Sequence, residues 1–215
     1  AETLAAWAEL GAVRCVVEKQ LDLSAEISVL AARRRDGKSV VWPATQNTHV
    51  NGILDLSVVP PTGVSLDLVD RAEGLALAIA DALDYVGVLG VEFFVVGDEI
   101  FVNELAPRPH NSGHWTIDAA TTSQFEQQIR AICGLGLGVT DLVSGGAAMV
   151  NLLGDLWEHG EPNWAVALDE PRAALHLYGK SEPRPGRKMG HLTVTADDPR
   201  VAAANALAVR SALVA

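Results

Sequence analysis

The chain has 215 residues, 49% of them hydrophobic, which suits one large domain or two small ones. Its formal net charge of −11 argues against a nucleic-acid-binding protein, because neutralising phosphates takes a basic surface. No apolar run approaches the ~20 residues that a membrane helix needs, and the N-terminus lacks a signal-peptide pattern, so we expect a cytoplasmic protein. Cys15 and Cys133 lie in apolar segments without a CxxC motif and are expected to be buried thiols.

The first half of the chain predicts a hairpin between two helices. In chain order, we expect a helix over 1–10, a β-rich run over 14–19, strands over 24–33, 38–42 and 53–59, and a helix over 65–85. Asp36-Gly37 is the turn of the hairpin, and the polar residues 45–52 are expected to be irregular. The apolar face of the second helix carries Leu68, Ala72, Leu75, Ile79, Ala82 and Leu83.

The second half predicts an α+β arrangement. We expect strands over 88–96 and 100–105, a helix over 121–133, strands over 147–153, 173–178 and 191–196, and a helix over 197–214. Ser123 is a possible cap of the 121–133 helix, whose apolar face has Phe125, Ile129 and Ile132. Strands followed by one helix after residue 147 indicate a small appended α+β unit.

Glu92 and Glu104 lie twelve residues apart, in two strands joined around residues 97–99. A three-residue loop would place them directly opposite, with Cβ atoms ~5 Å apart on one face. A two-residue turn would pair Glu92 with Asn103 instead and split the acids between faces. Opposed carboxylates destabilise a sheet unless a cation lies between them, and Mg²⁺ prefers oxygen ligands. The alternatives are a metal pair and two solvated acids. The apolar neighbours of both glutamates are expected to bury the two strands, which argues against solvated acids.

A polar stretch, NELAPRPHNSGHW, runs from Asn103 to Trp115. Its two prolines and one glycine prevent regular structure through most of it. Such a loop is either an exposed turn or the lining of an active site.

Several segments, in the same chain order, resemble the ATP-grasp family of 5-(carboxyamino)imidazole ribonucleotide synthases of purine biosynthesis. They are VEKQLDLSAEISVLAAR, PATQNTHVNGIL, VEFFV with NELAPRPHNSGHWT, and PRPGRKMGH. The likeness runs from about Val16 to His191, and HNSGHW followed by RPGRKMGH is specific to this enzyme among ATP-grasp proteins.

The resemblance implies an α+β fold in two parts. Residues 1–140 would form the ATP-grasp C-terminal lobe, an antiparallel sheet with packed helices, and residues 147–215 a small C-terminal α+β domain. The family's N-terminal domain and its lysine-bearing lobe have no counterpart, so we expect a C-terminal fragment that is inactive alone. Ala106 stands where the wider superfamily has a third metal ligand, which leaves Glu92 and Glu104 for the ions.

The resemblance also implies residue roles. The implied ATP contacts are Glu18, Lys19, Gln20, Leu21, Glu26, His49, Asn103 and Glu104. Glu92 and Glu104 would hold Mg²⁺, and Arg108 and His110 would be catalytic. The implied substrate contacts are Asn111, Ser112, Lys180, Arg184, Arg187 and Lys188, although a basic run can also be a solvated surface. His114 and Trp115 are expected to pack or cap.

The implied reaction is the ATP-dependent carboxylation of 5-aminoimidazole ribonucleotide by bicarbonate, through carboxyphosphate. ATP and Mg²⁺ would be the cofactors, and a homodimer is expected. Phosphoryl transfer of this kind relies mainly on positioning and charge neutralisation. Two alternatives stay open: another ATP-grasp ligase, and a fragment that acts only as a nucleotide-, metal- or partner-binding module.

Overall fold

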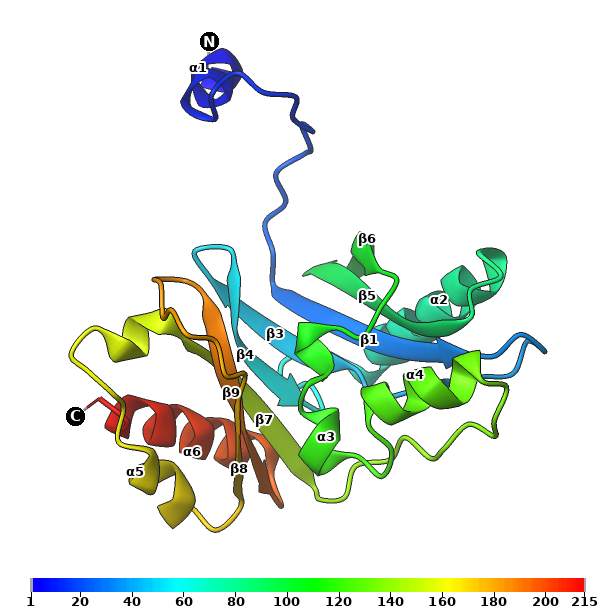
Figure 1. The fold of residues 1–215 in the computed structure, drawn as a ribbon. Coiled ribbons are helices and arrows are strands. Elements are labelled where there is room, and N and C mark those ends of the chain that lie inside the picture. Colours follow the sequence, from blue (N-terminus) through cyan, green and yellow to red (C-terminus); the bar gives the residue numbers. More distant parts are fainter. Residues whose placement is uncertain (1, 215) are drawn as a thin grey trace.

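The strands of the computed structural model, which describes residues 2–214, join in one antiparallel sheet (Figure 1). The strands are β1 Ala25–Arg33, β2 Ser39–Val41, β3 Thr45–Val50, β4 Ile53–Val59, β5 Gly87–Val96, β6 Glu99–Ala106, β7 Gly146–Leu153, β8 Ala173–Leu177 and β9 Lys188–Ala196. Their order is β6-β5-β1-β3-β4-β7-β9-β8, with β2 paired to β1. The expected α+β class and antiparallel sheet are confirmed.

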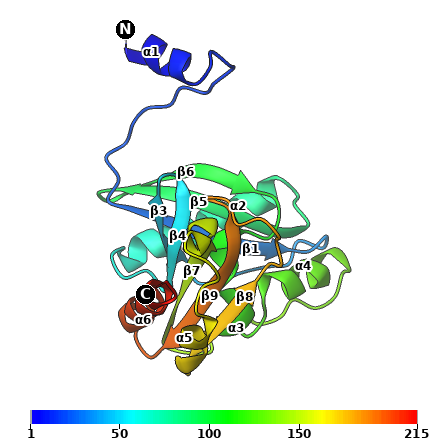
Figure 2. The same cartoon turned by 60° about the vertical axis from the view of Figure 1, so that its left-hand side comes forward.

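Apart from α1, the helices cover both faces of this sheet (Figures 1 and 2). The helices are α1 Glu2–Glu9, α2 Leu66–Ala82, α3 Thr116–Ala119, α4 Gln124–Ile132, α5 Trp164–Asp169 and α6 Pro199–Ala212, with 3-10 turns η1 Asn111–Gly113 and η2 Gly154–Trp157. Helix α2 packs on Ile27, Val29 and Phe93, and α6 packs on residues such as Val150 and Leu192. Strand alternation places these residues on one face, and η1, α3 and α4 lie against the other.

One ladder joins the two expected regions of the chain. Strand β4 pairs with β7 from Leu56↔Val150 to Val59↔Ala147, so the strands after residue 146 extend the sheet that the earlier strands begin. Arg210 of α6 reinforces this junction through a two-pronged contact with Asp55 of β4. The appended unit therefore contributes its strands to a shared sheet.

Three local expectations were wrong. Residues 45–50, expected to be irregular, form β3, and the β-rich run 14–19 forms no strand. The chain before β1 is an extended, exposed segment that ends in α1, which stands away from the sheet in Figure 1. Cys15 lies in that segment and Cys133 caps α4, so both thiols are exposed instead of buried.

The expected apolar faces of two helices also need correction. In α2, Leu75 and Leu83 are exposed, and the buried residues are Leu68 and the alanines at 72, 76 and 80. In α4, Ser123 caps the helix as expected, but Phe125, Ile129 and Ile132 are exposed. The side of α4 that faces the sheet instead buries Gln124, Gln127 and Ala131.

The described residues contain no helix that is both long and apolar enough to cross a membrane.

Candidate functional site

Glu92 and Glu104 are register partners on β5 and β6, but not for the reason that a three-residue loop would give. The turn has two residues: Val96 pairs with Glu99, and Gly97 has a φ of 57° at the first turn position. A β-bulge at Asn103 then shifts the register by one residue. The bulge brings the two acids back to the same face. The expected opposition of Glu92 and Glu104 is thus present, although the expected loop length was wrong.

Glu92 lies in a partly buried, polar environment. Its Oε1 atom is 3.3 Å from Nε2 of His110, and its Oε2 atom accepts a 3.4 Å hydrogen bond from Nδ2 of Asn103. Burial raises the pKa of Glu92, the charge of His49 lowers it, and the Glu104 carboxylate raises it again. Strand β6 is mostly exposed, so the expectation that both strands are buried was wrong for this one. Two such carboxylates suit a hard cation such as Mg²⁺, which would offset their mutual repulsion.

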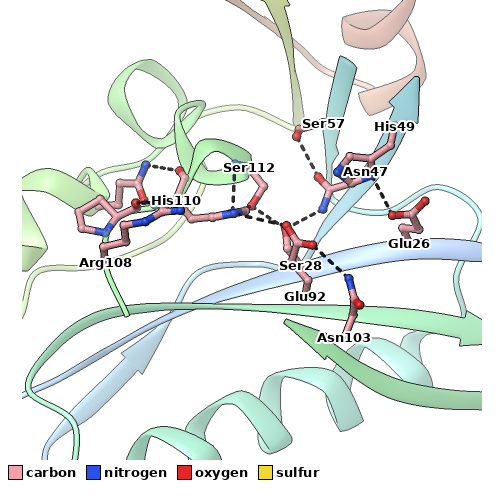
Figure 3. Close-up of polar contacts among 12 residues, drawn as sticks. Glu26, Ser28, Asn47, His49, Ser57, Glu92, Asn103, Arg108, His110 and Ser112 are labelled. Atoms are coloured by element: carbon pink, nitrogen blue, oxygen red, sulfur yellow. Dashed lines mark hydrogen bonds and ion pairs between the residues drawn. The ribbon is translucent and has the colours of Figure 1, made fainter. Parts of the chain in front are cut away.

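The 107–115 loop folds back over β5 and brings His110 to Glu92 (Figure 3). Gly90 of β5 permits this approach, because a Cβ atom there would lie 3.0 Å from Cβ of His110. The side-chain amide of Gln124 holds the loop, accepting from His110 N and donating to His110 O, both at 2.7 Å. Trp115 is fully buried, as expected, and its Nε1 donates to Thr45 Oγ1. Most of this loop is therefore an interior structure.

His110 is held between Glu92 and Ser112. Its Nδ1 atom lies 2.8 Å from Ser112 Oγ, opposite the Nε2 contact with Glu92. Burial lowers the pKa of His110 to about 4, with further lowering by the charges of Arg108 and Lys188. The ring is therefore neutral near pH 7. Arg108 is exposed beside it and donates to the Pro109 carbonyl.

A row of buried polar side chains continues from Ser112 across the sheet (Figure 3). Ser112 Oγ accepts from Ser28 of β1, Ser28 accepts from Asn47 of β3, and Asn47 accepts from Ser57 of β4, at 2.8–2.9 Å. The motifs did not single out Ser28, Asn47, Ser57 or Gln124. The signal that could have found Ser28 and Ser57 is a small polar residue between apolar neighbours in a strand, since such residues need a partner when buried.

Glu26 of β1 and His49 of β3 form a second pair, of one carboxylate and one imidazole. His49 Nδ1 lies 2.8 Å from Glu26 Oε2, although the two groups are not aligned as a hydrogen bond. A β-bulge between Thr48 and His49 accompanies this pair. The expected nucleotide contacts Glu26 and His49 thus lie together. Both are near enough to Glu92 for their charges to affect its pKa.

The basic residues in and just before the start of β9 differ in their surroundings. Lys188 is half-buried: burial lowers its pKa, the charge of Glu92 opposes that shift, and the charge of Arg108 adds to it. Lys180 donates to the carbonyl of Lys188 at 2.6 Å. Arg184 pairs with the Glu182 carboxylate, and Arg187 donates to the Glu182 carbonyl, so both are engaged within their own loop. Lys188 is thus close enough to Glu92 for the carboxylate charge to affect its pKa.

A cluster of histidines lies between α3 and strands β8 and β9. His176 Nε2 contacts Asp118 Oδ2 at 2.9 Å, and His191, which is 1% exposed, has a buried Nε2 atom without a hydrogen-bond partner. These three side chains have the composition of a metal site. However, the rings of His176 and His191 are stacked at 14° with centroids 4.6 Å apart. Nearly parallel stacked rings cannot both direct an in-plane lone pair at one ion, so this arrangement does not fit a metal.

The expected adenine hinge, Glu18 to Leu21, lies in the extended segment that precedes β1. Glu18, Lys19 and Gln20 are exposed and Leu21 is half-buried. The fold therefore brings together Glu92, Asn103, Glu104, Arg108, His110, Ser112 and Lys188, with Asn111 in η1 beside them, and leaves the hinge residues outside this group.

Comparison with known proteins agrees with this arrangement. Residues 1–125 match the ATP-grasp domain family, more than half of the chain. The chain belongs to the ATP-grasp family. Residues 147–205 match a second family, the phosphoribosylaminoimidazole carboxylase C-terminal domain. This match runs from β7 into α6.

Relatives of this ATP-grasp chain share one description. It is 47% identical over 180 residues to the N5-carboxyaminoimidazole ribonucleotide synthase of Bacillus subtilis strain 168, covering 83% of this chain and 46% of that protein. A crystal structure of the Thermus thermophilus synthetase superposes with a TM-score of 0.89 at 46% identity, over 100% of this chain and 57% of that one. An Aspergillus clavatus synthase in complex with ADP and 5-aminoimidazole ribonucleotide superposes with a TM-score of 0.82 at 32% identity, over 91% and 53%. The chain spans about half the length of these relatives.

Proposed function

We propose that this chain forms the metal- and substrate-binding half of an N5-carboxyaminoimidazole ribonucleotide synthase. The reaction would use ATP and bicarbonate to carboxylate the exocyclic amine of 5-aminoimidazole ribonucleotide through carboxyphosphate, in the cytoplasm. The observation that supports it most is the meeting of Glu92 and Glu104 with Arg108 and His110 on one sheet face. The shared description of the relatives supports the choice among ATP-grasp ligases.

The nucleotide side of the site would lie on β1, β3, β5 and β6. Mg²⁺ held by Glu92 and Glu104 would neutralise charge on the β- and γ-phosphates when bound. Asn103 stands beside both carboxylates and has an amide within reach of a phosphate. Glu26 and His49 would contact the ribose end, and residues 18–21 would contact the adenine.

The carboxylation side would lie on the 107–115 loop and β9. The Arg108 guanidinium is a planar fork that suits bicarbonate or carboxyphosphate. His110, Asn111 and Ser112 line the loop beside it, and Lys188 adds a cation from the region 147–215. Lys180, Arg184 and Arg187, in the loop before β9, would bind the ribose phosphate of 5-aminoimidazole ribonucleotide. We assign residues 1–140 to a partial ATP-grasp lobe, residues 147–215 to a small domain that completes the substrate site, and a homodimer to the assembly.

A chimera tests this proposal. This chain would replace the segment that it matches in the Bacillus subtilis relative, and turnover of ATP would be measured with and without 5-aminoimidazole ribonucleotide and bicarbonate. We expect ATP hydrolysis that depends on both. Hydrolysis that ignores 5-aminoimidazole ribonucleotide would favour another ATP-grasp ligase. A chimera that binds nucleotide without turnover would favour a binding module.

A further inference from the structure

The buried row that ends at His110 has a defined direction, which follows from counting hydrogens. The backbone N–H of Ser112 points at Nδ1 of His110, at 3.4 Å, and a backbone N–H can only donate. Nδ1 is therefore the acceptor of the ring. The hydroxyl of Ser112, 2.8 Å from the same nitrogen, then gives its single hydrogen to Nδ1.

Each further link follows from the one before. Since the single hydroxyl hydrogen of Ser112 is already donated to His110 Nδ1, Ser28 must be the donor in the 2.8 Å contact between the two hydroxyls. Ser28 then has none left for Asn47, so the Asn47 atom 2.9 Å away is the NH₂ group. The other end of that amide is its carbonyl oxygen, which accepts from Ser57 at 2.9 Å. With Nδ1 as the acceptor of the Ser112 N–H, the order Ser57, Asn47, Ser28, Ser112, His110 gives every contact one hydrogen.

The row is also shielded from water, which would otherwise offer alternative partners. Ser57 is 0%, Ser28 2% and Ser112 1% exposed, and Asn47 is 6% exposed. Asn47 and Ser57 are register partners, and Ser28 is the register partner of Glu92 across β1 and β5. Four neighbouring strands thus present their polar residues to one face, and the 107–115 loop lies over them.

We propose that Ser57, Asn47, Ser28 and Ser112 are positioning residues that fix His110 in the tautomer with its hydrogen on Nε2. The Nε2–H group then lies on the Glu92 side of the ring, where Nε2 is 3.3 Å from Glu92 Oε1. The imidazole is a hydrogen-bond donor toward the site. Its Nε2 atom has no lone pair with which to take a proton from a substrate amine.

This inference deepens the proposed function, on which its meaning for catalysis rests, because it selects one of two roles for His110. A donor at Nε2 would hold an anionic oxygen, such as one of bicarbonate or carboxyphosphate. The proton of the amine would have to leave by another group. The tautomer itself can be measured in the chain without any substrate.

Long-range ¹H–¹⁵N correlation spectra of the imidazole nitrogens test the proposal at pH 7.5, with His110 assigned from the His110→Gln spectrum. We expect a single form of His110 with its hydrogen on Nε2. A hydrogen on Nδ1, or an averaged pair of nitrogens, would overturn the proposal. Because no nucleotide or substrate is present, this result is independent of whether the chimera turns over.

Three variants and one control, Ser144→Ala, test whether the row, and not Ser112 N–H alone, sets the tautomer. Ser112→Ala should bring in a substantial fraction of the Nδ1–H form, and Ser112→Thr, which keeps the hydroxyl, should restore the wild-type spectrum. An unchanged spectrum in Ser112→Ala would overturn the role of the row. If Ser112→Ala does not fold, Ser28→Ala should have the same effect, since the Ser112 hydroxyl could then accept from Nδ1. Ser144→Ala removes a serine hydroxyl bonded elsewhere and should change nothing.

Discussion

Asn103 is the residue that places Glu104 opposite Glu92. The two-residue turn at Gly97-Asp98 would by itself pair Glu92 with Asn103, and the extra residue at the bulge moves the pairing on by one. The amide of Asn103 then donates to Glu92. A bulge that changes where side chains point is a common device beside active sites. The opposed position of the two carboxylates therefore depends on the bulge in β6.

Glu104→Gln should abolish Mg²⁺-dependent nucleotide binding and leave the fold intact. The substitution removes one of the two carboxylates that we propose as Mg²⁺ ligands, and it does so at an exposed strand position, so packing is hardly affected. Isothermal titration with ATP, with and without Mg²⁺, measures the effect. Glu99→Gln, an exposed acid on the same strand at the turn, is the matched control and should bind normally. Normal binding by Glu104→Gln would remove this residue from the metal role.

Glu92→Gln should stabilise the chain at neutral pH. Burial raises the pKa of Glu92, so its ionised form is less favourable in the folded state than in the unfolded state. The stabilising contribution of this group is present below its unfolded pKa, about 4.3, and is lost as pH rises through the folded value. We expect the Tm of the variant at pH 7.5 to be higher by ~2–4 °C, or about 1 kcal/mol. The difference should vanish at pH 3.5, and a lower Tm at pH 7.5 would contradict the argument.

The chain should lose stability as pH falls from about 6.5 toward 4. Burial lowers the pKa of His110 and His114 to about 4 and that of His191 to about 3. The unfolded chain, with histidine pKa values near 6.5, takes up protons in this window that the folded chain does not, so acid favours unfolding. Each histidine contributes up to about 1.4 kcal/mol per pH unit. Urea unfolding between pH 7 and 4.5 measures the slope.

His191→Gln should reduce that acid slope, whatever it does to stability at pH 7. His159→Gln changes an exposed histidine and should leave the slope as it is. Equal slopes in the wild type and in His191→Gln would show that His191 titrates alike in both states.

Lys188→Ala should weaken the binding of 5-aminoimidazole ribonucleotide to the chimera, and Arg187→Ala should do so much less. The charges of Glu92 and Arg108 both affect the pKa of the half-buried Lys188, but Arg187 is engaged by the Glu182 carbonyl. A lost hydrogen bond to a charged group corresponds to a ~10- to 100-fold weaker Kd. Equilibrium binding of the nucleotide substrate and of ATP separates the two effects. A loss of ATP binding alone would assign Lys188 to the nucleotide side instead.

The predicted elements were right where turn chemistry and apolar runs agree. The Asp36-Gly37 hairpin and the strands from β4 to β9 follow from such signals. Strand β3 was missed because its residues, TQNTHV, are mostly polar. They are polar because Asn47 joins the buried row and His49 meets Glu26, so the site requirement overrode the usual composition of a strand.

The buried face of α4 could not be read from apolar spacing. Phe125, Ile129 and Ile132 recur at helical intervals, which normally marks the core side. The structure buries glutamines instead, because their amides satisfy backbone groups of neighbouring loops. Gln124 holds His110, and Gln127 holds Gly138 in the same two-way manner. Such a clamp depends on which loop lies opposite, and sequence spacing does not contain that information.

The candidate site was largely predictable as a set of residues, since motifs preserve composition. Its geometry was not, because the side of the sheet that a residue faces depends on bulges. The direction of the buried row was also out of reach, since it depends on contacts between strands that are far apart in the chain.

The pairing of β4 with β7 has a mechanical consequence. Glu92 and Lys188 lie in regions that match two different families. The β4–β7 ladder, between Leu56–Val59 and Ala147–Val150, joins these two regions in one continuous sheet. A hinge between these regions would have to break that ladder. We therefore expect these two parts of the proposed site to move together, as one sheet.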